Sequence, residues 1–321
     1  MPRATGGRRH LAGRRLHFPL ERDGMGRMKR LLERLERVLV LAERVLGEVA
    51  PPELGASDFA SRLAFRWEQR AGGGHLLAMD APVLFDLDDL LGVEDSLAIL
   101  ERNTRQFLAA QPYNNVLLHG ERGTGKSSAV RGLLGRYADR GLRVVELDRS
   151  DLAQLPRVLA ALRAGEDFFF LVFCDDLSFA PGEAGYRELK AALDGSLEAR
   201  PENVCIVATS NRRHLVPESM EENRQARLDE EGELHLGEAL EEKLALSDRF
   251  GLVLGFYNFD QTTYLAIVQH YLGRAGFDEM DSDLRESALA WALARGSRSG
   301  RTARQFADDA IGRRGLEKAE A

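Results

Sequence analysis

Cysteines and long apolar runs are scarce in this sequence, and both absences exclude classes of protein. Of 321 residues only Cys174 and Cys205 are cysteine, too few for the disulfide framework of a small secreted domain. Each lies in an apolar stretch typical of a buried strand, which predicts reduced thiols in a cytoplasmic protein. No apolar run reaches the roughly 20 residues of a membrane-spanning helix, and no signal peptide is evident. We therefore expect no membrane among the partners.

The net charge is small for a chain of this size, but it is unevenly distributed. The total is −7, while residues 1–50 hold 12 Lys and Arg against 6 Asp and Glu, which leaves −13 for the remainder. The acidic remainder argues against sequence-independent DNA binding by the main domain. Residues 1–24 are expected to be a disordered basic leader. Two interpretations of it stay open: contact with nucleic acid or an acidic partner, or a solvated segment before a true start at Met25 or Met28.

Residues 25–80 are predicted to form a helical region. From Met28 to Val49, apolar residues recur in alternating steps of four and three, a heptad pattern of three repeats. A further apolar residue in each repeat widens the apolar face, which favours packing within the same protein over pairing with a partner helix. Two prolines end this helix, and a second helix is expected over residues 58–69.

Residues 120–127 read Gly-Glu-Arg-Gly-Thr-Gly-Lys-Ser, which is the P-loop pattern, between a strand-like stretch and a helix-like stretch. Glycines let the backbone N–H groups face one point, and the helix start adds positive charge there, so the loop favours a phosphate. We expect Lys126 to contact the β- and γ-phosphates of ATP and the Ser127 hydroxyl to bind Mg²⁺. The alternative is a plain glycine-rich turn. The predicted nucleotide-binding residues of the loop are Gly120, Glu121, Arg122, Gly123, Thr124, Gly125, Lys126, Ser127 and Ser128.

Two further apolar stretches end in polar residues. Residues 168–174 form an unbroken apolar run, typical of a strand buried on both faces of a parallel sheet, and Asp175 and Asp176 follow it. We expect Asp175 to hold Mg²⁺ through water and Asp176 to orient or deprotonate the attacking water. Asn211 follows a second such strand and is expected beside the γ-phosphate. The alternatives are two acids that cap a strand and an Asx turn.

Together these motifs resemble the AAA+ ATPase superfamily. The segment at residues 246–252, with Arg249 at its centre, is similar to the arginine-finger region of the Holliday-junction branch-migration ATPase. Segments at residues 102–107, 173–178 and 208–215 are similar to a bacterial family catalogued only as a domain of unknown function with AAA+ motifs. The resemblance covers residues 58–307.

The resemblance implies an α/β fold of the P-loop NTPase class. Residues 81–258 would form a parallel sheet of five strands in the order 5-1-4-3-2 with helices on both faces, and residues 259–321 a helical lid. Leu91 and Gly92 match the segment that packs on adenine. Arg249 matches the finger that reaches the neighbouring subunit's γ-phosphate.

The lid arginine is assigned to Arg304, with Arg301 as the second choice. Two departures from the family pattern are the Asp at position 176, where Glu is more frequent, and an acidic insertion before Arg249. For Arg249, the alternative is a surface arginine paired with Asp248 or with that insertion.

The predicted function is ATP hydrolysis by a homo-oligomer that remodels a protein or nucleic-acid complex. An ATP-dependent switch or loader with little turnover is the alternative. A P-loop kinase of small molecules ranks last, because the candidate arginines lie at a subunit edge and on a lid instead of around a substrate pocket.

Overall fold

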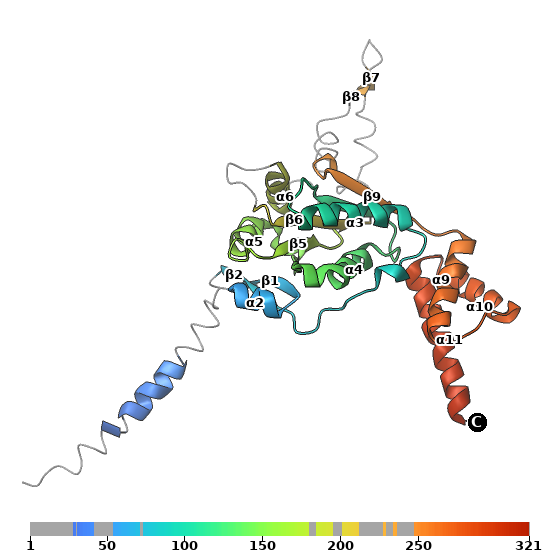
Figure 1. The fold of residues 1–321 in the computed structure, drawn as a ribbon, viewed down its shortest axis with the longest axis horizontal. Helices are drawn as coiled ribbons and strands as arrows, with labels where there is room; N and C mark the ends of the chain where they lie inside the picture. Colours follow the sequence, from blue (N-terminus) through green and yellow to red (C-terminus); the bar gives the residue numbers. More distant parts are fainter. Residues whose placement is uncertain are drawn as a thin grey trace, which may run out of the picture. The chain divides into compact units, whose positions relative to one another are not determined.

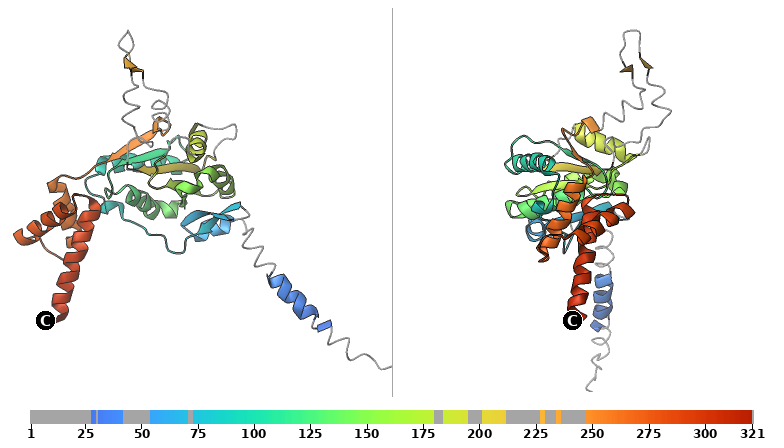
Figure 2. Two further views of the ribbon diagram at one scale, coloured as in Figure 1. Left: turned by 180° about the vertical axis from the view of Figure 1, so that it is seen from behind. Right: turned by 90° about the vertical axis from the view of Figure 1, so that its right-hand side faces the viewer.

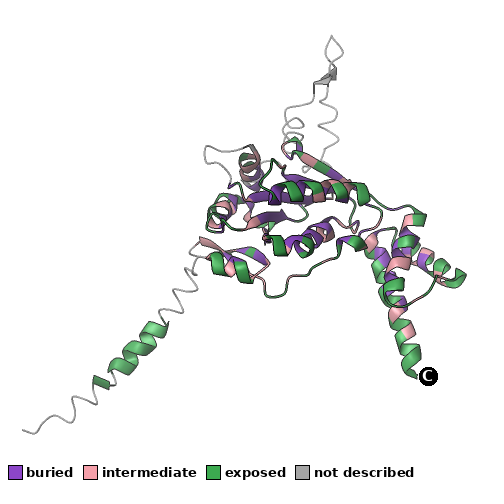
Figure 3. Cartoon of the chain, viewed as in Figure 1, coloured by how far each residue is buried: buried purple, intermediate pink, exposed green. Residues whose placement is uncertain are grey.

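The computed structural model describes residues 28–29, 31–41, 54–70, 73–179, 184–194, 201–211, 227–228, 234–235 and 247–320, and its contacts divide the chain into two units, Met1–Pro51 and Pro52–Ala321. In the first unit, residues 28–29 and 31–41 are helical with exposed side chains (Figure 3). The predicted heptad helix is therefore present over this part of its length. The predicted leader and residues 42–49 lie outside the described residues.

A seven-stranded sheet forms the centre of the second unit, in the order β2-β1-β4-β5-β6-β3-β9. The strands are β1 (Ala64–Arg70), β2 (Gly73–Ala78), β3 (Val116–Gly120), β4 (Leu142–Glu146), β5 (Phe169–Cys174), β6 (Val204–Ser210) and β9 (Leu252–Phe256). The last five are parallel, and their order β9-β3-β6-β5-β4 is the predicted order 5-1-4-3-2. The α/β class is confirmed, and the predicted number of five strands is wrong.

The first additional strand, β1, takes the place of the second half of the helix predicted over residues 58–69. Only α2 (Ala56–Ser61) is helical there; β1 follows it, pairs parallel with β4, and forms an antiparallel hairpin with β2. Phe65 and Trp67 are buried on β1, while Arg66 between them is exposed and donates two hydrogen bonds to Glu146 of β4. This is the period of two that a half-buried strand shows. The pairing with β4 decides the conformation of a segment whose composition also suits a helix.

Helices cover both faces of the sheet (Figures 1 and 2). Alternate residues of β5 point to opposite faces: Leu171 and Phe173 pack in one apolar cluster, and Phe170 and Val172 in the other. The first cluster includes α3 (Glu94–Leu108) and α4 (Lys126–Tyr137). The second includes α2, α5 (Leu155–Leu162) and α6 (Ala184–Asp194). Burial on both faces explains why the sequence of β5 is apolar without alternation.

Three helices follow β9 and form the predicted lid: α9 (Gln261–Arg274), α10 (Ser282–Ala294) and α11 (Gly300–Glu320). Tyr264 and Phe306 are fully buried between them. Short elements complete the description: η1 (Leu87–Asp89), η2 (Ala138–Arg140), η3 (Arg149–Gln154), and the paired strands β7 (Arg227–Leu228) and β8 (Leu234–His235). Among the helices of the described ranges, none is long and apolar enough to cross a membrane.

Candidate active site

A cavity of about 570 Å³ lies at the carboxyl ends of β3, β5 and β6, between the glycine-rich loop and the lid. In open parallel sheets this edge is where ligands bind. Residues of four separate stretches meet in its lining. They are Arg122 to Ser128 from the loop, Asp175, Asp176, Thr209 and Asn211 from the strand ends, and Arg301 and Arg304 from α11.

The loop backbone turns at three glycines with positive φ: Gly120 (+133°), Gly123 (+79°) and Gly125 (+105°). A Cβ atom on Gly120 would lie 1.8 Å from the backbone oxygen of Phe256 on β9, so no other residue fits there. Gly125 is the residue before the first turn of α4, and the N–H groups of a first turn have no partner within the helix. Lys126, Ser127 and Ser128 of this turn line the cavity. The loop is therefore shaped to accept an anion at the start of α4.

Lys126 is buried at the start of α4, with 7% of its surface exposed. Its ammonium donates hydrogen bonds to the backbone oxygens of Gly120 (2.7 Å) and Glu121 (2.6 Å), and more weakly to Asn211 Oδ1 (3.3 Å). Burial lowers the pKa of Lys126 below its ordinary value of 10.5, while the nearby carboxylates of Asp175 and Asp176 act in the opposite direction. A cation that has lost much of its water gains from an anionic ligand. Gly120 and Glu121 thus hold Lys126 without lining the cavity themselves.

Asp175 and Ser127 meet at the position predicted for a metal ion. The Ser127 hydroxyl donates to Asp175 Oδ1 at 2.7 Å, and the Thr209 hydroxyl donates to the same oxygen at 2.5 Å. Thr209 in turn accepts the backbone N–H of Asp176 at 2.8 Å and is 1% exposed. Thr209 is not among the site residues that the sequence predicted. Its place at the end of a buried strand, two residues before Asn211, was the available signal.

Asp176 has φ of +52°, a left-handed conformation that Asp tolerates better than most residues. Its Oδ1 accepts a hydrogen bond from the Asn211 amide, and its Oδ2 lies 3.8 Å from the Arg122 guanidinium. Asn211 also accepts from Lys126. Asn211 therefore connects the lysine of the loop with the candidate general base, as the predicted positions at neighbouring strand ends require.

The two candidate lid arginines both line the cavity, but their surroundings differ. The Arg301 backbone N–H donates to the Gly123 oxygen at 3.1 Å, and its charge is close enough to lower the pKa of Lys126. Arg304 pairs with Asp308 (Nε–Oδ1, 2.9 Å) and its guanidinium lies 4.8 Å from the centre of the Tyr271 ring. Arg301 is thus the arginine adjacent to the loop.

Two other predicted residues do not line the cavity. Of the two residues predicted to pack on adenine, Leu91 lines the cavity and Gly92 does not. Gly92 has a φ of +79°, and its N–H donates to Glu94 Oε1 at 2.7 Å. Arg249 lies half-buried in the turn before β9, outside the cavity of its own chain. Its predicted contact with a neighbouring subunit stays a prediction, and most of the acidic insertion before it lies outside the described residues.

A family model matches residues 60–314 of the sequence, under the description "Protein of unknown function (DUF815)". The chain belongs to this family. The match covers most of the chain and includes every residue discussed for the cavity. It confirms the predicted membership of a family catalogued as a domain of unknown function. No curated protein matches the sequence.

Solved structures similar to this DUF815 chain include those of three proteins. The RuvB Holliday junction branch migration motor of Thermotoga maritima is 16% identical, with a TM-score of 0.46, over 70% of this chain and 63% of that chain. The Aeropyrum pernix ORC1 protein, solved in complex with DNA, is 18% identical, with a TM-score of 0.49, over 72% of this chain and 62% of that chain. AMPPCP-bound DnaA from Aquifex aeolicus is 18% identical, with a TM-score of 0.45, over 74% of this chain and 67% of that chain. The chain spans less than two thirds of the length of RuvB.

Proposed function

We propose that this DUF815 chain binds ATP with Mg²⁺ and hydrolyses the ATP to remodel a macromolecular complex. The observation that carries the proposal is the meeting, in one cavity, of a buried lysine in an anion-shaped loop, a Ser127–Asp175–Thr209 hydrogen-bond set and a second carboxylate, Asp176. Binding alone needs only the loop. Hydrolysis also requires a metal ligand and a general base, which Asp175 and Asp176 at the carboxyl end of β5 would supply.

The chain's own residues fit a nucleotide triphosphate with one metal ion. At positions 120, 123 and 125 a Cβ atom would overlap other atoms of the protein, so only glycine lets the loop keep this shape. Lys126 together with Arg122, Arg131, Arg301 and Arg304 makes the lining net positive despite three aspartates. Within the described residues, no group of three or more His, Cys, Asp or Glu could hold a metal unaided. Ser127 and Asp175 would therefore hold Mg²⁺ together with phosphate oxygens, which is usual for this ion. The bound Mg²⁺ would neutralise charge on the phosphates.

Each site residue then has a separate task. Lys126 and the N–H groups at the start of α4 bind the anion, and Thr209 holds Asp175 in its orientation. Asp176 accepts a proton from water at a carboxylate oxygen, and Asn211 positions that water. Arg301 reaches the phosphate end from the lid; the structure favours it over Arg304, which is engaged with Asp308 and Tyr271.

Arg249 is proposed to complete the site of a neighbouring subunit, so the active form would be a homo-oligomer. A guanidinium supplied from outside meets the charge that develops during phosphoryl transfer. Its position outside its own cavity supports this assignment.

The switch with little turnover remains the second candidate, and one observation favours it. Asp176 is held by Asn211 and lies near Arg122, so the candidate base is engaged instead of free. Asp is also one methylene shorter than the Glu more frequent at this position.

Turnover measurements separate the two candidates. We expect wild-type protein to release phosphate from ATP, and Asp176→Asn to bind ATP with Mg²⁺ but hydrolyse it about 10²–10⁴-fold more slowly. Asp139→Asn, which changes an exposed carboxylate in η2 outside the cavity, is the matched control. Tight binding without turnover in wild-type protein would favour the switch. If wild-type protein does hydrolyse ATP, capture of partners by Asp176→Asn would identify the complex that is remodelled.

Mixing two inactive variants tests the role of Arg249. Lys126→Ala lacks its own site but still carries Arg249, whereas Arg249→Ala keeps its site. Their mixture should regain activity, because mixed subunits pair an intact site with an intact arginine. A mixture that stays inactive although the subunits co-assemble would show that Arg249 does not act on a neighbour.

A further inference from the structure

Asp89 is an acidic residue in the wall of a cavity that is otherwise built for an anion. It ends η1 and immediately precedes Leu90 and Leu91, which also line the cavity. Ile267 and Tyr271 of α9 line the same end. The side chains of Leu90, Leu91, Ile267 and Tyr271 make this end largely apolar, so it suits the flat face of a base better than a phosphate chain.

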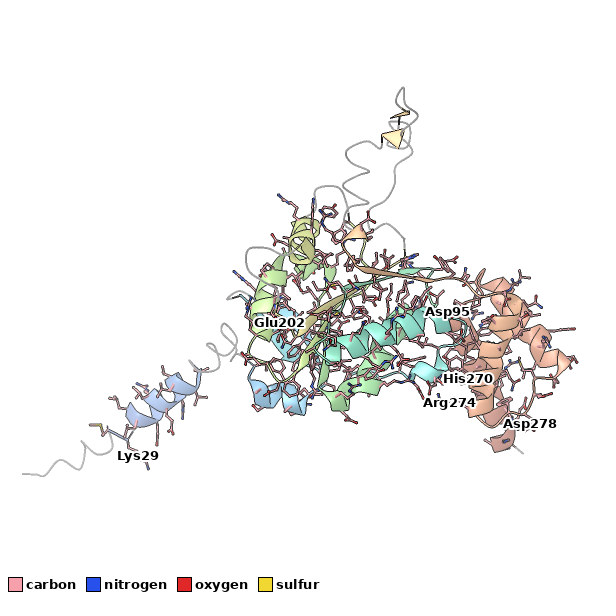
Figure 4. The ribbon with its side chains drawn as sticks, turned by 45° about the horizontal axis from the view of Figure 1, so that its top comes forward. Lys29, Asp95, Glu202, His270, Arg274 and Asp278 are labelled. Atoms are coloured by element: carbon pink, nitrogen blue, oxygen red, sulfur yellow. The ribbon has the colours of Figure 1, made fainter. Side chains whose placement is uncertain are left out.

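The charge of Asp89 is balanced from the lid. Oδ1 of Asp89 accepts a hydrogen bond from His270 Nε2 at 2.7 Å and a second one from Arg274 Nη1, both on α9 and both labelled in Figure 4. The Asp89 side chain is 12% exposed, and Arg274 makes an ion pair with it. A carboxylate this close to an anion site is tolerated because a cation accompanies it. The pair also fixes which oxygen faces the lid.

The second oxygen, Oδ2, is not used in this way. Both donors of α9 bind Oδ1, and no described residue donates a hydrogen bond to Oδ2. A carboxylate accepts about four hydrogen bonds in all, so Oδ2 keeps the capacity to accept bonds from a ligand. An acceptor is therefore available at the base end of the cavity.

We propose that Asp89 determines base specificity by accepting, at Oδ2, a hydrogen bond from the exocyclic amine of adenine; this rests on the nucleotide site proposed above. Adenine carries an amine where guanine carries a carbonyl oxygen. The amine donates to a carboxylate, whereas the carbonyl oxygen would face a second acceptor and be repelled. ATP is accepted and GTP is rejected for the same reason.

The substitution Asp89→Asn should reverse this preference. Only the oxygen of the new amide can accept the bonds from His270 and Arg274, so the amide nitrogen must take the place of Oδ2. A donor then stands where the acceptor was. It opposes the amine of adenine and suits the carbonyl oxygen of guanine.

The experiment measures the affinities of three triphosphates by calorimetry: ATP, GTP and purine riboside triphosphate, which lacks the amine. Wild-type protein should bind ATP about 10- to 100-fold more tightly than purine riboside triphosphate, the ratio expected for one hydrogen bond to a charged acceptor. In Asp89→Asn this ratio of affinities should fall to about one or below, and the affinity for GTP should rise relative to the affinity for ATP.

Two controls separate base recognition from a purely structural contact between η1 and the lid. Asp88→Asn makes the same chemical change one residue earlier, where the carboxylate is exposed and pairs with Arg136 (2.5 Å), and should leave all ratios unchanged. Arg274→Gln keeps a hydrogen-bond donor but removes the positive charge, and it should reduce the affinity for all three triphosphates by a similar factor. If Asp89→Asn does the same as Arg274→Gln, Asp89 is only a lid contact and the proposal is wrong.

The possible failures are distinct. If wild-type protein binds none of the three ligands, the nucleotide site itself is wrong and this inference with it. If it binds all three equally, the site stands and the role of Asp89 is refuted. Should Asp89→Asn fail to fold, Asp89→Glu displaces the carboxylate by one methylene and should reduce the ratio of ATP to purine riboside triphosphate; an unchanged ratio refutes the proposal.

Discussion

Replacing Thr209 with valine removes one hydroxyl from the centre of the candidate active site and leaves the shape of the side chain nearly unchanged. That hydroxyl donates to Asp175 Oδ1 (2.5 Å) and accepts the N–H of Asp176 (2.8 Å). Asp175 is exposed, so water can replace the lost donor there. The N–H of Asp176 is partly buried and would lose its acceptor, which lowers the free energy of unfolding by about 1–3 kcal/mol.

The larger effect should be on the metal. Asp175 would keep its bond from Ser127 but lose the contact that orients it from behind. Loss of such an outer contact usually reduces metal affinity or activity by about 10–100-fold. We therefore expect Thr209→Val to need about 10–100-fold more Mg²⁺ for half-maximal ATP turnover.

Ser210→Ala provides the control, because Ser210 is the next residue of β6, is equally buried, and donates to the Leu177 oxygen at 2.8 Å instead of to an aspartate. Urea unfolding should show both variants destabilised, and a Mg²⁺ titration of ATP turnover should separate them. If Thr209→Val and Ser210→Ala need the same Mg²⁺ concentration as wild-type protein, Thr209 does not position Asp175 for a metal.

Three other predictions concern the loop and the lid. Lys126→Ala should abolish ATP binding in calorimetry. Because burial lowers the Lys126 pKa, the free energy of unfolding of nucleotide-free wild-type protein should rise with pH between that lowered pKa and 10.5. Urea unfolding at a series of pH values should show a smaller rise in the variant. Arg301→Ala should weaken ATP binding or turnover more than Arg304→Ala in parallel assays, and the reverse order would restore Arg304 as the lid arginine. Gly120→Ala should destabilise the protein by about 3 kcal/mol or more in urea unfolding, because a steric clash adds to the strain of positive φ. Gly312→Ala is the control: nothing lies near its new Cβ, so the change should be neutral or stabilising.

Much of the site could be predicted from the sequence because its parts are local patterns. The loop at residues 120–127 depends on glycines at fixed spacing, and the residues after β5 and β6 follow unbroken apolar strands. Parallel strands place their carboxyl ends at one edge, so Asp175 and Asn211 were expected together and do lie in one cavity. The strand order of the five parallel strands also followed, through the family resemblance.

The hairpin of β1 and β2 shows what local pattern does not decide. Residues 64–69 were predicted helical, yet they are part of strand β1 because β4 offers an open edge that is distant in sequence. The choice between Arg301 and Arg304 was likewise open, since two arginines one helical turn apart look alike in sequence. Only the close approach of α11 to Gly123 distinguishes them.

By itself, then, the sequence determined the chemistry of the loop, the two acidic residues after β5 and the alternation of strands and helices, since each depends on neighbours along the chain. Only the tertiary structure decided that β1 and β2 extend the sheet, that Thr209 contacts Asp175 and Asp176, and that Asp89 contacts His270 and Arg274. In each of these a side chain or strand meets a partner from a distant segment. Asp89 and Arg274 are 185 positions apart, and only folding brings the two charges together.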